Sequence, residues 1–432
     1  MHEMKTVIMA GGRGTRISSI ASDIPKPMIK IDGKPVLEHE IICLREQGYR
    51  DIIITVSHLG QVIMDYFGDG SSLGVKIEYF FEEEPLGTAG ALYRISDKLS
   101  DDFLLLNADA IFDVDFNRFT AYHREKGGFV TLFTHPNSHP YDSGLILADK
   151  EGLVEKWLTK EDKRPQWYQN RVNAGLHVIS KKLLMETSQL ANAGKVDLDR
   201  QLLKPLAGTG KMFCYDSPEY VKDMGTPDRY ESVCSDFMEG RVSAKNLRNM
   251  QKAVFLDRDG TINKYVGFLR SINDFELLEG VADAIKIMNS LGYLVIVATN
   301  QPVIARGEVT VKELLEIHCK METLLGLEGA YLDAVYYCPH HPHKGYEGEI
   351  AELKTECCCR KPKPGMLLNA AKDFNIDLGC SWMVGDGEID VRAGIAAGCK
   401  TVLLGQNDRD FGQDATAENL LQFVKEHVCT EM

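Results

Sequence analysis

Short apolar runs alternate with amphipathic stretches along the first half of the chain. Runs rich in β-branched and aromatic residues predict strands, and apolar residues three or four positions apart predict helices. This pattern predicts a helix over Val36–Gln47 and strands over Lys5–Ala10, Asp51–Ser57, Val75–Phe81 and Phe103–Asn107. Alternating strands and helices are typical of a doubly wound α/β sheet, which binds ligands at the carboxyl ends of its strands.

A second alternation follows a polar, helix-prone stretch near residues 238–251. Its predicted strands are Ala253–Leu256, Tyr293–Ala298, Ala334–Tyr337, Trp382–Val384 and Thr401–Leu404. A length of 432 residues suits two domains of this kind. We therefore expect two Rossmann-like α/β domains, residues 1–240 and 251–432, joined by a linker at residues 241–250.

Charge and composition narrow the classes of partner. The net charge is −14, whereas a general nucleic-acid binder needs a positive field. No apolar run approaches the ~20 residues that cross a bilayer, and the early glycine motif leaves no room for a signal peptide. Without a signal peptide, the chain is expected to stay in the cytosol, so its eleven cysteines argue against a disulfide framework. We expect a cytoplasmic protein that binds neither nucleic acid nor membrane, and a homo-oligomer stays open.

A glycine loop and a lysine turn predict a phosphate site in the first domain. The loop Ala10-Gly11-Gly12-Arg13-Gly14-Thr15-Arg16 directly follows a predicted strand. Glycines there let backbone N–H groups approach a phosphate chain, and Arg16 offers a charged fork suited to pyrophosphate. The rigid turn Pro25-Lys26-Pro27-Met28 then presents a single lysine.

These motifs, together with Gly33-Lys34-Pro35 and Pro85-Leu86-Gly87-Thr88-Ala89-Gly90, resemble the sugar-1-phosphate nucleotidyltransferases over about residues 4–232. The resemblance implies a GT-A-like sheet and an in-line attack of a sugar-1-phosphate oxygen on the α-phosphorus of a nucleoside triphosphate. It implies that Asp109, after Asn107-Ala108, and Asp223, in Val221-Lys222-Asp223-Met224-Gly225, hold Mg²⁺. The other implied residues are Arg16 and Lys26 for catalysis and Gly11, Gly12, Gly14, Gly87, Lys156, Asn173 and Gly175 for substrate binding.

Two aspartates end the first predicted strand of the second domain. Ala253–Leu256 continues into Asp257-Arg258-Asp259-Gly260-Thr261. Two carboxylates this close repel each other unless a cation lies between them, which predicts Mg²⁺. Asp257 can then attack phosphorus to give an aspartyl-phosphate, while Asp259 protonates the leaving group and later activates water.

Three further motifs follow in order: Thr299-Asn300-Gln301 at a strand end, Arg360-Lys361-Pro362, and Gly385-Asp386 with Asp390. With the first motif they resemble the haloacid dehalogenase (HAD) phosphatase superfamily. The resemblance implies that Thr299 binds the phosphoryl group, Lys361 offsets its charge, and Asp386 joins Asp257 and Asp259 around Mg²⁺. The short spacing between the first two motifs predicts a minimal cap and an open mouth. We expect Asn300, Arg306 and Arg360 to contact substrate there.

A cysteine-rich segment predicts a structural metal. Cys338-Pro339-His340 and Cys357-Cys358-Cys359 offer thiolate and imidazole ligands for tetrahedral Zn²⁺, with His341, His343 and Cys358 as competing ligands. Four protein ligands would close the site and hold a long loop. The segment resembles the zinc-containing heptose bisphosphate phosphatases and the related histidinol phosphatases, which implies Cys338, His340, Cys357 and Cys359 as the ligands. The sequence departs from the pattern of these relatives at Pro302-Val303 and Gly387, near the expected substrate mouth, so the resemblance defines the chemistry better than the specificity.

The two resemblances together limit the pair of reactions that the chain can combine. A phosphatase that removed a 1-phosphate would destroy the substrate of the other domain, whereas removal of the distal phosphate of a sugar 1,7-bisphosphate would generate it. We therefore expect a bifunctional enzyme with a heptose 7-phosphatase and a heptose 1-phosphate guanylyltransferase. Its substrates would be GTP and phosphorylated heptoses, and its product GDP-D-glycero-α-D-manno-heptose.

Three alternatives stay open. The chain could join a transferase for another hexose 1-phosphate, with UTP or CTP, to a histidinol-phosphatase-like or other sugar phosphatase. The first domain could bind a nucleotide sugar without turnover, which intact Arg16, Lys26, Asp109 and Asp223 argue against. The second domain could be a zinc-stabilised interaction module, which intact Asp257 and Asp259 argue against.

Overall fold

The computed structural model describes residues 4–11, 24–57, 59–405 and 409–430. The chain divides into two compact units. Unit 1 consists of Met1–His135, Gly144–Thr159 and Val172–Asn246, and unit 2 consists of Pro136–Ser143, Lys160–Arg171 and Leu247–Met432. Two short segments from the N-terminal half of the sequence therefore belong to unit 2.

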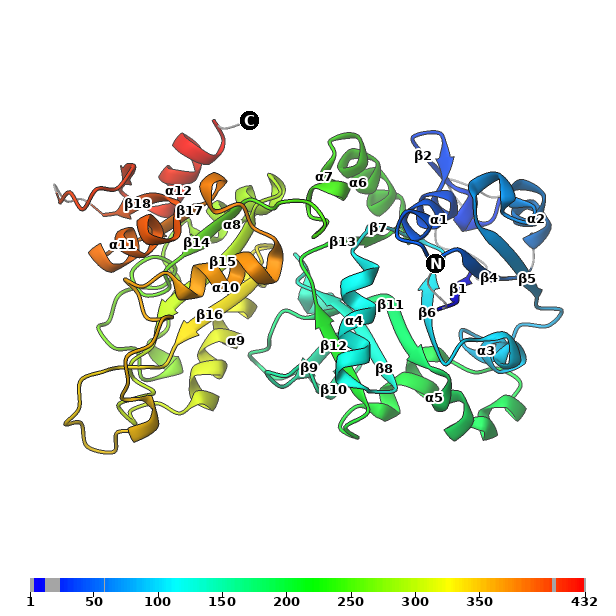
Figure 1. Ribbon diagram of the computed structural model, residues 1–432, viewed down its shortest axis with the longest axis horizontal. Helices are drawn as coiled ribbons and strands as arrows, with labels where there is room; N and C mark the ends of the chain where they lie inside the picture. Colours follow the sequence, from blue (N-terminus) through cyan, green and yellow to red (C-terminus); the bar gives the residue numbers. More distant parts are fainter. Residues whose placement is uncertain (1–3, 12–23, 58, 406–408, 431–432) are drawn as a thin grey trace. The chain divides into compact units, whose positions relative to one another are not determined.

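Unit 1 is built on a nine-stranded mixed sheet with the order β10-β9-β11-β6-β1-β4-β5, and β8 and β12 branch from β11 (Figure 1). Strands β6, β1, β4 and β5 are parallel, which confirms the predicted α/β alternation, but β11 runs antiparallel to both β6 and β8. The strands are β1 Thr6–Met9, β4 Asp51–Val56, β5 Lys76–Phe81, β6 Asp102–Asn107, β8 Val130–His135, β9 Leu145–Ala148, β10 Val154–Leu158, β11 Val172–Ser180 and β12 Met212–Asp216.

Helices and two small sheets complete unit 1. The predicted helix forms as α1, and strands β7 and β13 pair antiparallel beside the main sheet. The helices are α1 Val36–Glu46, α2 Gly60–Phe67, α3 Gly90–Arg94, α4 Phe116–Lys126, α5 Lys181–Glu186, α6 Pro227–Met238 and α7 Arg241–Ala244. The small sheets are β2 Lys30–Ile31 with β3 Lys34–Pro35, and β7 Ala110–Asp113 with β13 Tyr220–Asp223.

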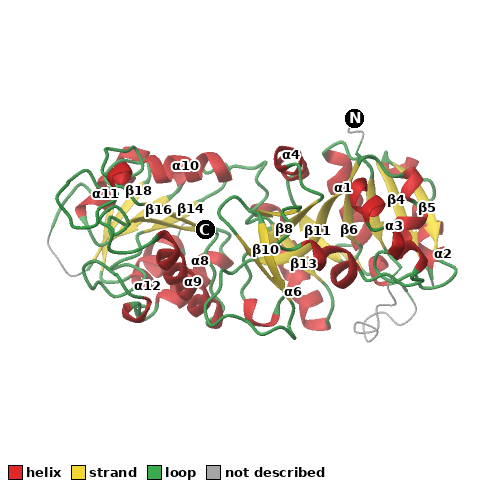
Figure 2. Cartoon of the chain, turned by 90° about the horizontal axis from the view of Figure 1, so that it is seen from below, coloured by secondary structure: helices red, strands yellow, loops and turns green. Residues whose placement is uncertain are grey.

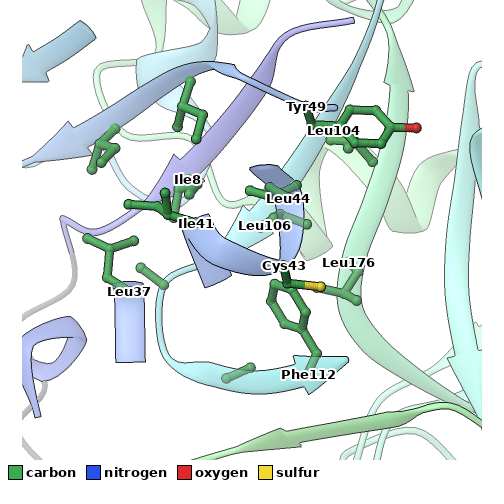
Figure 3. Packing of buried hydrophobic residues seen from close by; sticks show 14 of the residues in the cluster. Ile8, Leu37, Ile41, Cys43, Leu44, Tyr49, Leu104, Leu106, Phe112 and Leu176 are labelled. Carbon is green, nitrogen blue, oxygen red and sulfur yellow. The ribbon is translucent and has the colours of Figure 1, made fainter. Parts of the chain in front are cut away.

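The alternation of side chains along the parallel strands explains why these runs are wholly apolar. Ile8, Leu104 and Leu106 face α1, where they pack against Ile41 and Leu44 (Figure 3). The intervening residues belong to a second core on the other face of the sheet: Val7, Ile53, Phe103 and Leu105. Because both faces are buried, each strand forms a continuous hydrophobic run.

Unit 2 is a six-stranded parallel sheet with the order β16-β15-β14-β17-β18-β19. Helices α10 and α11 cover one face, and α8, α9 and α12 cover the other (Figure 2). The strands are β14 Ala253–Leu256, β15 Leu294–Asn300, β16 Ala334–Cys338, β17 Trp382–Gly385, β18 Lys400–Leu404 and β19 Ala415–Ala417. The helices are α8 Val281–Ser290, α9 Val311–Leu327, α10 Gly365–Phe374, α11 Glu388–Ala397 and α12 Leu420–Phe423.

All five strands predicted for this part of the chain are confirmed, within about two residues at each end. The connection from β14 to β15 holds α8 and one short turn, Ile272–Asp274, which agrees with a minimal cap. All eleven cysteines are free thiols. Among the described helices, none has both the length and the apolar composition needed to span a bilayer.

A buried histidine in unit 1 generates a prediction about acid stability. His177, on β11, is 1% exposed, and neither ring nitrogen has a hydrogen-bond partner within the described part of the chain. Burial lowers its pKa to about 4. The unfolded chain, with a histidine pKa of ~6.5, therefore binds the proton first as pH falls.

Between pH 7.5 and pH 5 this difference is expected to cost the native state about 2 kcal/mol of unfolding free energy. His177→Leu should remove that part of the pH dependence while leaving a folded protein at pH 8. The measurement is urea unfolding of unit 1 at both pH values. An identical pH dependence in the two proteins would show that His177 is already charged or solvated in the native state.

Candidate functional sites

In unit 1, the predicted lysine and the first predicted metal carboxylate are in direct contact. The turn Lys26–Met28 follows Pro25 and buries Pro27 and Met28, so the lysine is held at its start. Lys26 Nζ donates to Asp109 Oδ2 over 2.5 Å, and the lysine side chain is only 10% exposed. A charge-assisted hydrogen bond of this kind fixes the aspartate at the carboxyl end of β6.

The second predicted metal carboxylate lies beside the first. Strand β13 pairs with β7, and the N–H of Met224 donates to the carbonyl oxygen of Asp109 over 3.0 Å. Asp223 accepts two hydrogen bonds from Arg229 Nη1, at 3.0 and 2.7 Å. Burial alone would raise the pKa of Asp223, but Arg229, the Gly225 N–H and the charge of Lys26 hold that pKa below its usual value.

The segment Asp223–Thr226 has a local reason for its position. Asp223 ends β13, and its Oδ1 accepts the Gly225 N–H over 2.8 Å. Thr226 then caps α6, with Pro227 in the first helical turn, where its missing N–H costs no hydrogen bond. This arrangement places Arg229 in the first turn of α6, opposite the aspartate. Sequence reasoning did not identify Arg229 as a site residue.

The glycine motifs are only partly described. Gly12, Gly14 and Arg16 lie outside the described residues. Gly11 follows β1, and its carbonyl accepts a hydrogen bond of 2.7 Å from Ser57 Oγ. Gly87 adopts φ +81°, and a side chain there would overlap the backbone of Val196, so only glycine suits this turn.

The predicted sugar-phosphate residues are placed in two different strands. Asn173 and Gly175 lie in a bulge of β11, where Asn173 Oδ1 accepts the Gly175 N–H over 3.3 Å. This bulge lies against the side chain of Asn107, which ends β6 two residues before Asp109. Lys156 is exposed on β10, the edge strand, and β9 separates β10 from β11.

Sequence reasoning also missed a buried carboxyl group beside Asp109. Glu40 on α1 is 1% exposed. Burial first, and then the negative charge of Asp109, raise the pKa of Glu40 well above its usual value. No sequence signal indicated that the Glu40 side chain would be buried. Its position falls within the amphipathic pattern of α1, but its side chain is acidic.

In unit 2, the predicted nucleophile forms an ion pair with the predicted lysine. Lys361 Nζ lies 2.7 Å from Asp257 Oδ1 and 2.6 Å from Asp390 Oδ1, and its side chain is 1% exposed. Burial alone would lower the pKa of Lys361, but the two carboxylates raise it. The lysine therefore carries a positive charge at the carboxyl end of β14.

Three carboxylates gather around this lysine. Oxygen atoms of Asp257, Asp386 and Asp390 all lie within 4.8 Å of one another. Burial and then the charge of Asp257 raise the pKa of Asp386, and burial also raises that of Asp390 against the attraction of Lys361. One lysine does not neutralise three carboxylates, and an all-oxygen donor set suits a hard divalent cation such as Mg²⁺.

Asp259 has a different environment from the three clustered carboxylates. Arg258 Nη2 donates to its two oxygens over 2.9 and 2.8 Å, and Asn263 and Gln301 donate over 3.1 and 2.9 Å. Arg258 is completely buried, and its Nη1 lies 3.3 Å from His318 Nε2. The cluster thus contains Asp390 where the sequence analysis placed Asp259.

The strand β15 supplies the next predicted residues. Thr299 is 1% exposed, and its Oγ1 accepts a hydrogen bond of 2.9 Å from Gln301 Nε2. Asn300 makes two hydrogen bonds with the backbone of Lys361, each of 3.0 Å. In this structure Asn300 therefore positions the loop that carries the lysine.

The two predicted arginines lie on loops near the cysteine segment. The Arg306 guanidinium lies 4.0 Å from the ring centroid of Phe268 and 4.5 Å from that of Tyr346, and Nη2 is 3.3 Å from His341 Nε2. Arg360 Nη1 donates to the carbonyl of His340 over 3.2 Å. Both side chains are thus held by cation–π contacts or backbone carbonyls.

The cysteine segment forms a compact metal-ligand set. The sulfurs of Cys338, Cys357 and Cys359 are 3.3 to 3.6 Å apart, and His340 Nδ1 lies 3.6 and 3.5 Å from the sulfurs of Cys338 and Cys359. Sulfurs bound to zinc at ~2.3 Å stand ~3.7 Å apart in a tetrahedron, so the set fits that geometry. Cys358 is exposed and outside the set.

This cluster lies beside the segments that carry Gln301 and Lys361. Cys338 ends β16, and its carbonyl accepts the Gln301 N–H over 2.8 Å. Cys359 is followed by Arg360 and Lys361. A metal ion in the cluster would therefore fix both ends of the long loop from β16 and the start of the segment that carries the lysine.

Comparisons with known proteins find relatives for each half of the chain. A family model described as nucleotidyl transferase matches residues 5–239, and one described as HAD-hydrolase-like matches residues 358–427. The D-glycero-beta-D-manno-heptose-1,7-bisphosphate 7-phosphatase of Yersinia pestis is 42% identical over 166 residues, which cover 38% of this chain and 84% of that protein. The mannose-1-phosphate guanylyltransferase of Mycobacterium tuberculosis is 30% identical over 250 residues, which cover 57% and 68%.

Among solved structures, HddC from Yersinia pseudotuberculosis aligns with a TM-score of 0.47 and 26% identity over 54% of this chain and 99% of that one. From the family models and the curated relatives, the chain belongs to the nucleotidyl transferase family, and its C-terminal part belongs to the HAD-like phosphatase family of the Yersinia pestis relative. It is an enzyme that joins a nucleotidyltransferase to a phosphatase. Units 1 and 2 are called the transferase unit and the phosphatase unit below.

Because Cys357 belongs to the cysteine cluster, we expect its substitution alone to release the bound metal. Cys357→Ser should lower the metal content of full-length protein, purified without chelator, from about one ion per chain to below about one fifth of that. Cys358→Ser is the matched control and should keep its metal, because Cys358 lies outside the cluster. The measurement is elemental analysis by mass spectrometry. Full metal content in Cys357→Ser, with loss in Cys358→Ser, would contradict the ligand set.

Proposed function

We propose that the chain catalyses two consecutive steps of GDP-D-glycero-α-D-manno-heptose synthesis. The phosphatase unit removes the 7-phosphate of heptose 1,7-bisphosphate, and the transferase unit then transfers GMP from GTP to heptose 1-phosphate and releases pyrophosphate. The observation that carries this proposal is the presence in one chain of the Asp257–Lys361 site and the Lys26–Asp109–Asp223 site. The names of the heptose bisphosphatase and guanylyltransferase relatives support the choice of substrates.

In the phosphatase unit, Asp257 attacks the phosphorus of the distal phosphate. A bond forms between a carboxylate oxygen and phosphorus, the bond to the sugar oxygen breaks, and Asp259 gives its proton to that oxygen. Asp259 then takes a proton from water, which attacks the same phosphorus and releases inorganic phosphate and free Asp257. Asn263 and Gln301 orient Asp259, and Thr299 contacts the phosphoryl group beside Lys361.

The phosphatase site must supply positive charge to bind a phosphate dianion. Lys361 provides one charge next to the nucleophile. The carboxylates of Asp257 and Asp386 would hold Mg²⁺, which when bound offsets the charge of the phosphoryl group. The sequence analysis placed Asp259 in the same shell. In this structure Asp259 is bonded to Arg258, Asn263 and Gln301, and we keep both of its proposed roles, in that shell and in proton transfer. Asn300, Arg306 and Arg360 would contact the substrate at the mouth.

In the transferase unit, an oxygen of the sugar 1-phosphate attacks the α-phosphorus of GTP. The bond to the β-phosphate oxygen breaks, and pyrophosphate leaves without a covalent enzyme intermediate. Lys26 and Arg16 would stabilise the triphosphate charge, and Gly11, Gly12, Gly14 and Gly87 would let the backbone approach it. Asp109 and Asp223 would hold Mg²⁺, which supplies charge between the two substrates when bound.

Lys156, Asn173 and Gly175 would contact the sugar phosphate. Asn173 and Gly175 lie close to the carboxyl end of β6, where Asp109 is located, which supports their assignment. Lys156 is exposed and available for an anionic ligand. Cys338, His340, Cys357 and Cys359 would hold a structural Zn²⁺ that keeps Arg360 and Lys361 in place. We place the enzyme in the cytoplasm, where nucleoside triphosphates and reduced thiols coexist.

A second candidate differs in the sugar and the nucleotide. The relative named mannose-1-phosphate guanylyltransferase favours a hexose 1-phosphate as the acceptor. Against this candidate stands the joint presence of a phosphatase related to heptose bisphosphatases. The contacts between Lys26 and Asp109 and between Asp257 and Lys361 argue against a mere sensor or an interaction module.

The two activities are predicted to be separable by single substitutions. Asp257→Asn should lower phosphate release from heptose 1,7-bisphosphate by at least about a thousandfold, because the nucleophile is lost. Its pyrophosphate release from heptose 1-phosphate and GTP should be unchanged. Asp223→Asn should show the converse, and each variant is the control for the other. Undiminished pyrophosphate release in Asp223→Asn would remove Asp223 from the mechanism.

Substrate choice is predicted to follow the order phosphatase, then transferase. With heptose 1,7-bisphosphate, phosphate should appear before pyrophosphate, and GTP should support pyrophosphate release at least about a hundredfold better than UTP, CTP or ATP. Both anomers of the bisphosphate are assayed, because the Yersinia pestis relative is named for the beta form. Faster turnover of mannose 1-phosphate or of another nucleotide would favour the second candidate.

A further inference from the structure

Two segments of the N-terminal sequence, 136–143 and 160–171, fold as part of the phosphatase unit. They are joined to each other by side-chain bonds. Asn170 Oδ1 accepts the Asn137 N–H over 3.0 Å, and Asn170 Nδ2 donates to the Asn137 carbonyl over 2.7 Å. Arg164 donates to the carbonyls of Pro140 and Ser143. The two segments therefore form one bonded pair, called here the double strap.

Helix α9 holds the double strap through three residues on one of its faces. The Thr323 hydroxyl accepts the Tyr168 N–H over 2.9 Å and lies 3.0 Å from the carbonyl oxygen of the same residue. Glu322 Oε2 accepts the Asn170 N–H over 2.8 Å. A Cβ at Gly326 would lie 2.6 Å from Pro140 Cγ, so the absence of a side chain there lets the strap approach the helix.

These contacts are buried and directed. Thr323, Tyr168 and Asn170 are 4%, 6% and 5% exposed. The spacing of residues 322, 323 and 326 places them on one side of a helix. The adjoining side carries Leu314, Met321 and Leu325 of the phosphatase core, and also His318 next to Arg258. Helix α9 thus contacts the phosphatase core and the strap through adjoining faces.

Covalent continuity connects the strap to the transferase. Segment 160–171 begins one residue after the end of β10, which carries Lys156, and ends directly before β11, which carries Asn173. Asn170, held by Glu322, is three residues from Asn173. We propose that α9 of the phosphatase unit anchors the sugar-phosphate loop of the transferase, with Thr323, Glu322 and Gly326 as positioning residues for the acceptor. This inference rests on the proposed contacts of Lys156 and Asn173 with the sugar phosphate.

The test is Thr323→Val in the full-length enzyme, with Thr323→Ser as the matched control. Valine keeps the shape of threonine but leaves the Tyr168 N–H without its acceptor, whereas serine keeps the hydroxyl. The KM for heptose 1-phosphate should rise about tenfold in the valine variant and about twofold or less in the serine variant. The KM for GTP and the phosphatase kcat/KM should stay within about twofold of wild type.

Two further measurements separate positioning from a loss of folding. Trypsin should cut the valine variant faster after Lys160 and Lys163, while the phosphatase activity shows that α9 and its core are intact. Gly326→Val, which displaces Pro140 rather than Tyr168, should reproduce the selective rise in KM. An unchanged KM for heptose 1-phosphate in both variants, or an equal rise for GTP, would overturn the proposal.

The failure of this inference can be told apart from failure of the proposed function. Lys156→Ala and Asn173→Ala test the acceptor contacts themselves. If they raise the KM for heptose 1-phosphate and Thr323→Val does not, only the anchoring role of α9 is wrong. If neither raises it, the proposed acceptor site is wrong and the anchoring proposal falls with it.

Discussion

A lysine held against crowded carboxylates is the interaction on which both sites depend. Lys361 lies between Asp257 and Asp390, and Lys26 lies against Asp109. Carboxylates at neighbouring strand ends repel one another, and removing one partner of a buried ion pair typically costs about 3–5 kcal/mol. Each lysine comes from a loop far along the chain from its aspartate. The ion pairs therefore join loops to sheets as well as preparing a place for phosphate.

The surroundings of the phosphatase site serve to keep that lysine in place. Asn300 binds the backbone of Lys361 from one side, and the Cys338 cluster holds the residues that precede it. Arg258 meanwhile keeps Asp259 out of the three-carboxylate group and leaves it with two amide donors. In the proposed mechanism, one group of carboxylates would thus provide the nucleophile and the cation ligands, and Asp259 beside it would transfer protons.

Much of this could be predicted from the sequence because the signals are local. Buried parallel strands form apolar runs, and the motifs Asp257-Arg258-Asp259, at a strand end, and Cys357-Cys358-Cys359, in a loop, are contiguous in the sequence. The antiparallel half of the first sheet could not be predicted, since its register depends on long-range pairing. The place of Asp259 depends on Arg258, which lies against His318 of a distant helix, and that of Asp390 depends on its ion pair with Lys361. The double strap is held largely through backbone groups, which leave no hydrophobic pattern, and Arg16 lies outside the described residues.

We propose that two separate carboxylate groups in this chain each hold one divalent cation. Manganese binding to the full-length enzyme, counted by electron paramagnetic resonance with the cysteine cluster already loaded with zinc, tests it most directly. The account predicts two sites, of which Asp386→Asn removes one and Asp109→Asn removes the other. A single site in the wild-type enzyme, or the loss of both sites after either substitution, would contradict it.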